Sequence, residues 1–236
     1  MSQTLTDRLL NACQLGETRS RGQTLLMLIE LPDAPGTVDP EPFAGPDHPI
    51  RKVTRRVAFE GAWDLERAHK FADLFDSMAA DWAKRADEPR SASISDAIKR
   101  GNVPLAGHWL ELGSGTGAGT AVLHDAGIKA VALDLAMQML GNADPTLAPQ
   151  IQGDSSSLPV RDQSVDAILC VNMLLFPSEV DRVLRQDGTL VWVNSLGDQT
   201  PIHLPPTDVL LALPGEWEAT TARAGSGFWV SAKRRR

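Results

Sequence analysis

The second half of the chain alternates short apolar runs with amphipathic stretches, and this alternation predicts strands and helices in turn. The expected strands are residues 108–112, 129–134, 150–154, 165–171 and 188–194. The expected helices are residues 118–126, 135–142, 178–185 and 208–213. Regular alternation of this kind is typical of right-handed crossovers and of a parallel sheet covered by helices on both faces.

The flanking segments extend this pattern. Residues 216–223 and 227–233 are joined by a glycine-containing turn and predict an antiparallel hairpin at the sheet edge. Apolar residues at three- and four-residue steps predict helices over residues 64–84 and 93–100. We therefore expect an α/β fold, with a Rossmann-like, doubly wound, mostly parallel sheet of seven strands and an antiparallel C-terminal edge hairpin.

The first quarter of the chain has a different character. Residues 2–15 have the spacing of an amphipathic helix, and residues 24–31 and 53–59 are expected to be strands paired in a small hairpin. Residues 32–49 contain six prolines and two glycines, so they predict a long loop or linker. We divide the chain into an N-terminal extension, residues 1–62, and a domain of residues 63–236. The extension's hairpin offers a way to pair two copies in a homodimer.

Composition excludes several functions. The net charge of −7 and the pI near 5.2 argue against nucleic-acid binding, which needs a basic face. The absence of tyrosine excludes a phenol base. The two cysteines lie far apart, and the five histidines are never four residues apart, so we expect neither disulfides nor a metal site. Without a signal peptide or a membrane-length apolar run, the sequence predicts a soluble, cytoplasmic protein.

The most informative segment runs from Trp109 to Gly119, where a strand leads through alternating glycines into a helix. Glycine permits positive φ angles and lets a ligand approach the main chain closely. In open α/β sheets this first strand–helix turn binds nucleotide-like ligands. Gly113 to Ala118 also fits the dinucleotide pattern G-x-G-x-x-A, so the glycines alone leave the ligand open.

The charge around this loop favours a cationic ligand. Residues 109–166 contain seven acids and two bases, a field that suits a sulfonium cation better than a pyrophosphate. Asp134 ends the second strand of the alternating region, where it is placed to accept hydrogen bonds from ribose hydroxyls. Glu111 precedes the glycines, where it can orient the amino group of a methionine moiety, and Asp154 ends the third strand, where it can accept from an adenine amino group.

These residues resemble the class I S-adenosylmethionine-dependent methyltransferases, especially the small-molecule branch that includes the ubiquinone and menaquinone biosynthesis enzymes. The resemblance covers roughly residues 70 to 235 in segments. It implies S-adenosylmethionine as the cofactor and assigns a set of residues to its site. These residues are Glu111, Gly113, Ser114, Gly115, Gly117, Asp134, Leu135, Met139, Asp154, Ser155, Asn172 and Met173.

The expected reaction is methyl transfer to a small molecule that the sequence does not name. Alignment of acceptor and donor can contribute ~7–11 kcal/mol, and a general base is needed only for an acceptor that carries its proton. His203, in the loop after the fifth strand of the alternating region, is the only base candidate. Aromatic residues could roof an apolar acceptor, although helix packing explains most of them. These are Trp63, Phe71, Phe75 and Trp82.

Two alternatives stay open at this point. An NAD(P)-dependent oxidoreductase would share the glycine loop and the acid at the end of the second alternating strand. A non-catalytic module would bind S-adenosylmethionine without an acceptor pocket.

Overall fold

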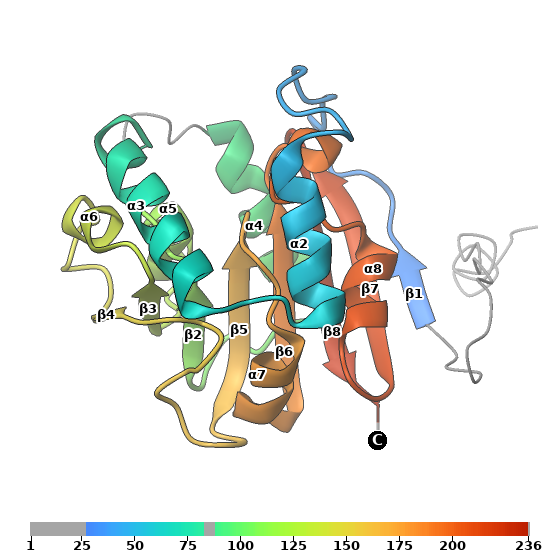
Figure 1. Ribbon diagram of the computed structural model, residues 1–236. Coiled ribbons are helices and arrows are strands. Elements are labelled where there is room, and N and C mark those ends of the chain that lie inside the picture. Colours follow the sequence, from blue (N-terminus) through green and yellow to red (C-terminus); the bar gives the residue numbers. More distant parts are fainter. Residues whose placement is uncertain (1–26, 83–87, 236) are drawn as a thin grey trace, which may run out of the picture.

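The computed structural model describes residues 27–82 and 88–235 and contains an eight-stranded sheet (Figure 1). The strand order is β1-β7-β8-β6-β5-β2-β3-β4. The strands are β1 (Met27–Glu30), β2 (Trp109–Leu112), β3 (Ala130–Asp134), β4 (Gln150–Gln152), β5 (Val165–Val171), β6 (Leu184–Asn194), β7 (Trp217–Ala224) and β8 (Gly227–Arg234). Only β8 runs antiparallel to its neighbours, so the predicted Rossmann-like, mostly parallel sheet is confirmed.

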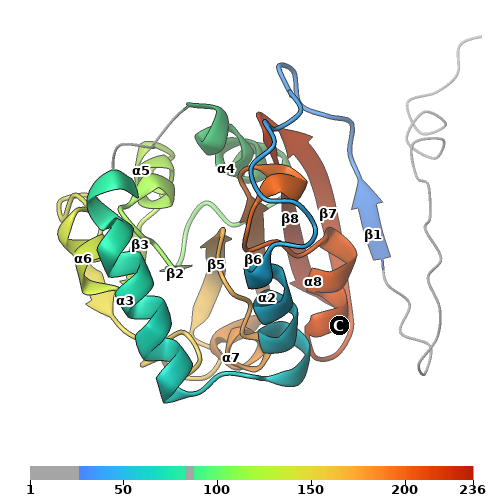
Figure 2. The same ribbon diagram turned by 45° about the horizontal axis from the view of Figure 1, so that its top comes forward.

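Helices cover both faces of this sheet. They are α2 (Pro49–Glu60), α3 (Leu65–Trp82), α4 (Glu88–Arg100), α5 (Ala118–Asp125), α6 (Met137–Gly141), α7 (Pro177–Val183) and α8 (Pro206–Ala212). The core on one face includes side chains of α2, α7 and α8, and the core on the other includes α4 and α5. Figure 2 shows α3, α4 and α5 around the end of the sheet towards which β5 points.

The central strands of the sheet are almost completely buried. All four residues of β2 are buried, and the apolar run in β5 is buried from residue 167 to residue 170. Trp192 on β6 and Trp229 on β8 have no exposed surface. These strands carry side chains that pack in the cores on both faces of the sheet. This burial on both faces explains why their sequences are continuously apolar.

The predicted strand at residues 53–59 is wrong, because this segment lies in helix α2. Pro49 occupies the first turn of α2, where its missing N–H costs nothing. Thr54, Val57 and Ala58 are the buried residues, a spacing of three and four that suits one face of a helix. The expected N-terminal hairpin therefore does not form.

The edge of the sheet also differs from the prediction. Strand β1 pairs in parallel with β7, from Met27 opposite Glu218 to Glu30 opposite Thr221. The C-terminal hairpin of β7 and β8 is thus covered by an eighth strand instead of forming the edge. The expected helix at residues 2–15 lies outside the described residues. The region 32–48 contains no helix or strand, as its prolines predict.

Candidate functional site

A cavity of about 430 Å³ lies at the carboxyl ends of the central parallel strands. Its lining comes from the ends of β2, β3 and β5 and from helices α3, α4, α5 and α6, together with the turn after β4. Residues just beyond β5 and β6 complete it. This is the edge of an open α/β sheet at which ligands generally bind.

The β2–α5 turn forms one wall of the cavity. Gly113, Gly115 and Gly117 all have positive φ angles, from 57° to 88°. A Cβ atom at residue 113 would lie 2.8 Å from Met173 Cγ, whereas nothing lies within 4 Å of one at residue 115. The Ser114 hydroxyl is buried and has no hydrogen-bond partner. The turn therefore offers open main chain and an unpartnered polar atom, as a polar ligand requires.

Glu111 is a buried carboxyl group beneath this turn, with 1% of its surface exposed. Its Oε2 accepts a hydrogen bond from Thr120 Oγ1 of α5, at 2.5 Å. Burial raises the pKa of Glu111 to about 7, and the nearby Asp134 carboxyl adds to this rise. A carboxylate in such a place gains strongly from a cationic partner.

Asp134 ends β3 and faces the glycine turn. Its Oδ2 accepts from the Gly115 amide at 2.7 Å, and its Oδ1 accepts from the Ala136 amide at 2.8 Å. Burial raises the pKa of Asp134, while these amide hydrogen bonds oppose the rise. Each oxygen keeps a further lone pair, so the carboxylate is fixed in orientation and can still accept hydrogen bonds.

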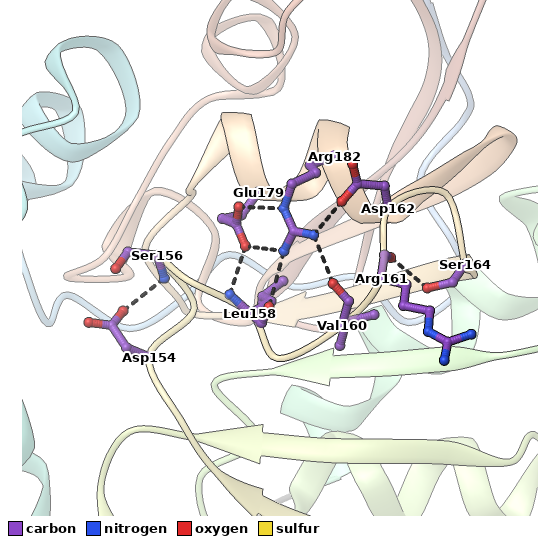
Figure 3. Close-up of polar contacts among 9 residues, drawn as sticks. All are labelled: Asp154, Ser156, Leu158, Val160, Arg161, Asp162, Ser164, Glu179 and Arg182. Atoms are coloured by element: carbon purple, nitrogen blue, oxygen red, sulfur yellow. Dashed lines mark hydrogen bonds and ion pairs between the residues drawn. The ribbon is translucent and has the colours of Figure 1, made fainter.

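Asp154 lies in the turn after β4 and is bound to the α2–α3 connection. The Trp63 indole N–H donates to both of its oxygens, at 2.9 and 3.2 Å, and the Ser156 amide donates to Oδ1 at 2.8 Å. An arginine anchors the following residues, 158–162 (Figure 3). Arg182 bonds Glu179, Asp162 and the carbonyls of Leu158 and Val160.

The ends of β5 and β6 are tied together at the cavity. Asn172 has φ 50°, a left-handed conformation that asparagine tolerates. Its Nδ2 donates to Ser195 Oγ at 2.8 Å, and its Oδ1 accepts from the Ser195 amide at 2.9 Å. The side chain of Asn172 therefore holds the two strand ends together, beside Met173.

Five aromatic rings, which we call the aromatic wall, line the same cavity. They are Trp63, Phe71, Phe75, Trp82 and Phe176. Neighbouring rings along this set lie 5.3 to 6.2 Å apart between centroids, mostly edge to face. Such contacts stabilise a ring cluster beyond the burial of its area.

The charge of the cavity has one sign among the described residues. The acidic residues that line it are Glu111, Asp125, Asp134 and Asp154. No lysine, arginine or histidine of the described part of the chain lines it. The same part of the chain shows no group of three side chains placed to hold a metal ion. The cavity thus favours a cationic group over a phosphate.

Eleven of the twelve residues predicted to bind a cofactor line this cavity. The exception is Gly117, which is the N-cap of α5 and has a positive φ of 88°. His203 does not line the cavity either. Its Nδ1 lies 3.2 Å from the Gly197 carbonyl oxygen, its ring packs on Phe228, and burial lowers its pKa.

Sequence reasoning missed several lining residues. Gly119, Asp125, Phe176, Ser195 and Ile202 lie on the cavity but were not assigned to a site. Phe176, Ser195 and Ile202 follow the carboxyl ends of β5 and β6, and this position was the available signal for them. Gly119 was visible as the last of the alternating glycines.

Comparisons with known proteins show what this chain is similar to. Residues 110–192 match the family described as "Methyltransferase domain". The biotin biosynthesis bifunctional protein of Cellvibrio japonicus is 35% identical over 105 residues, which are 40% of this chain and 21% of that protein. The chain thus spans about a fifth of the length of this curated relative.

Two solved structures have the same fold. A Thermotoga maritima protein named as an S-adenosylmethionine-dependent methyltransferase has a TM-score of 0.55 at 15% identity, over 69% of this chain and 99% of that chain. A Methanococcus maripaludis protein named likewise has a TM-score of 0.52 at 20% identity, over 71% and 93%. Residues 110–192 are therefore similar to a methyltransferase domain, and the chain shares its fold with these two structures.

Proposed function

We propose that this protein transfers a methyl group from S-adenosylmethionine to a small-molecule acceptor. One observation carries the proposal: a single cavity joins the glycine turn to the three carboxyl groups Glu111, Asp134 and Asp154, and no described cationic side chain lines it. A donor with a sulfonium and an ammonium group matches this charge. The aromatic wall of the same cavity offers an apolar surface for an acceptor.

The residues present fit this cofactor. The Ser114 hydroxyl is buried without a partner, and the space beside Gly115 is open. Glu111 would hold the amino group of the methionine moiety, Asp134 the ribose hydroxyls, and Asp154 would accept from the adenine. Each of these side chains is already oriented by hydrogen bonds from the protein, so little ordering cost remains on binding.

The bound cofactor supplies a methyl group already activated by positive charge on sulfur. The chain then has to position the acceptor and exclude water. Alignment alone can contribute ~7–11 kcal/mol. The apolar rings of the wall, with Leu174 and Ile202, would exclude water from this reaction. No general base is assigned, because His203 lies outside the cavity.

A nucleotide-dependent oxidoreductase fits less well. Two of the three acids, Glu111 and Asp154, have no task with a dinucleotide, and a pyrophosphate would face their charge. A helix N-terminus can still bind a phosphate unaided, so the two ligands need a direct comparison. The non-catalytic alternative requires the space beside the cofactor to be filled, and none of residues 27–62 lines the cavity.

Calorimetric titration with S-adenosylhomocysteine and with NADH tests the proposal. We expect the first to bind and the second not to bind. Asp134→Ala should abolish binding by freeing the Gly115 and Ala136 amides, and Gly115→Val by forcing a branched side chain into a positive-φ position. Asp144→Ala, on an exposed turn outside the cavity, is the matched control. Unchanged affinity in the first two variants would contradict the assignment.

We further infer a cytoplasmic enzyme that acts on small molecules rather than on nucleic acid or at a membrane. The net charge of −7 supports this view. Among the described residues, no helix has the length and apolar character needed to cross a bilayer. Division of the chain after residue 62 stays a proposal, supported by the start of the cavity lining at Trp63. The homodimer was expected from an N-terminal hairpin that could pair two copies. This hairpin does not form, so nothing in the structure supports a homodimer.

A further inference from the structure

The cavity has a second, apolar half beside the carboxylates. Its lining, which we call the apolar pocket, consists of Trp63, Phe71, Leu174, Phe176 and Ile202. We propose that the apolar pocket is the acceptor subsite and that it takes an uncharged, flat, apolar small molecule. This inference rests on the proposed methyl transfer, because it places the acceptor next to the cofactor carboxylates.

The rings of the apolar pocket form a preassembled binding surface. Trp63 lies 5.3 Å from Phe71 and 5.4 Å from Phe176 between ring centroids, at interplanar angles of 68° and 74°. All three rings are half-buried and line the cavity. Ring surface is thus left uncovered by protein, and a flat apolar molecule would extend the edge-to-face packing.

The floor of this pocket is built from fully packed residues. Leu174 is 5% exposed and Ile202 is 7% exposed, and both belong to one apolar cluster with Val57 of α2. The polar atom of Trp63 is already satisfied, because its indole N–H donates to Asp154. Helix α2 and the strand ends therefore hold the pocket open without any ligand, as in most small-molecule sites.

Charge selects against an ionised acceptor. The Asp154 carboxylate contacts this half directly, because it accepts the Trp63 indole N–H. Two further polar residues of the cavity, Asn172 and Ser195, are hydrogen-bonded to each other. An anion would meet the carboxylates of the other half and would find no cation among the described lining residues. A cation would compete with the donor for the same carboxylates. A neutral acceptor avoids both costs.

Binding of 2-naphthol to the protein saturated with S-adenosylhomocysteine tests this proposal by calorimetry. We expect 2-naphthol to bind at least about tenfold more tightly than 2-naphthalenesulfonate, which has the same ring system and a negative charge. Phe71→Ala and Phe176→Ala should each weaken 2-naphthol binding about tenfold and leave the affinity for S-adenosylhomocysteine within about twofold. Phe59→Ala is the matched control, because Phe59 is 42% exposed and lies outside the cavity.

Three results would overturn the proposal: no binding of 2-naphthol, equal binding of the sulfonate, or variants at residues 71 and 176 that bind like the Phe59 control. If an alanine variant fails to fold, Phe71→Leu or Phe176→Leu removes the ring and keeps most of the apolar volume. Failure of the wild-type chain to bind S-adenosylhomocysteine would instead contradict the proposed function. In that case 2-naphthol titrated into the free protein still decides whether the subsite exists.

Discussion

At the scale of single residues, Glu111 carries the largest electrostatic cost in the cavity. Burial raises its pKa from the ordinary value of 4.5 to about 7. Between these two pH values the folded chain holds this proton and the unfolded chain does not. Stability contributed by this group therefore falls as pH rises through that window and is level above it. The protein accepts this cost at a position where a cationic ligand would offset it.

Glu111→Gln should remove this pH dependence. Urea unfolding of the ligand-free protein at pH 5 and pH 8 measures the change in the free energy of unfolding. We expect the wild-type chain to lose about 2.5 kcal/mol more than the variant between these values, since a pKa difference of one is worth about 1.4 kcal/mol and part of the window lies below pH 5. Parallel pH profiles for the two proteins would show that Glu111 is not protonated in the folded state near neutral pH.

Gly119 shows how closely the turn fits this carboxyl group. A Cβ atom there would lie 2.2 Å from Glu111 Oε1. Glycine to alanine in a helix ordinarily stabilises by about 0.5–1 kcal/mol. Gly119→Ala should instead displace the carboxylate and lower the affinity for S-adenosylhomocysteine at least about tenfold, or about 1.4 kcal/mol.

Gly141→Ala in α6 provides the comparison, because nothing lies within 4 Å of a Cβ atom at that position. It should leave calorimetric binding unchanged. Equal affinities for the two variants would mean that Glu111 tolerates displacement and does not contact the ligand.

At the scale of elements, the sequence predicted best where tertiary structure and local pattern agree. Strand β5 was expected over its observed range, residues 165–171. A short apolar run bounded by polar residues is typical of a buried strand. Helix α2 was misassigned because Val53 and Val57 fit a strand by residue type and a helix by spacing. Burial of the α2 face against the sheet and the end of β5 decided the outcome, and this contact is not visible in a short sequence window.

Strand β1 should contribute to stability but not to binding. Leu28 packs against the main core, whereas Ile29 is 40% exposed. Leu28→Ala should lower the free energy of unfolding by about 2 kcal/mol, the low end for a large-to-small change at a partly buried site. Ile29→Ala should change it by less than about 0.5 kcal/mol.

The affinity for S-adenosylhomocysteine should be unchanged in both β1 variants, because no residue of β1 lines the cavity. Weakened binding in Leu28→Ala would show that the edge strand is coupled to the site.

At the scale of the whole molecule, the carboxylate half of the cavity could be predicted from the sequence. Glu111 and Asp134 lie near the ends of β2 and β3, and Asp154 follows β4. These strands are parallel, so their carboxyl ends lie at one edge of the sheet. The apolar pocket could not be predicted in the same way. Phe176 and Ile202 meet Trp63 only because the loops after β5 and β6 fold towards the α2–α3 connection. Contacts between loops depend on tertiary packing, for which local periodicity gives no signal.

Ligand binding should stabilise the whole fold, because the cavity is lined by the ends of β2, β3 and β5 and by helices α3 to α6. A ligand present at 100 times its dissociation constant adds about 2.7 kcal/mol to the free energy of unfolding. We expect this increment in urea unfolding with S-adenosylhomocysteine and no increment with NADH at the same concentration. Leu28→Ala should start from a lower stability and keep the full increment, because distant sites act additively. Asp134→Ala should lose the increment. If Leu28→Ala lost it as well, the edge of the sheet and the cavity would have to unfold as one coupled unit with the ligand.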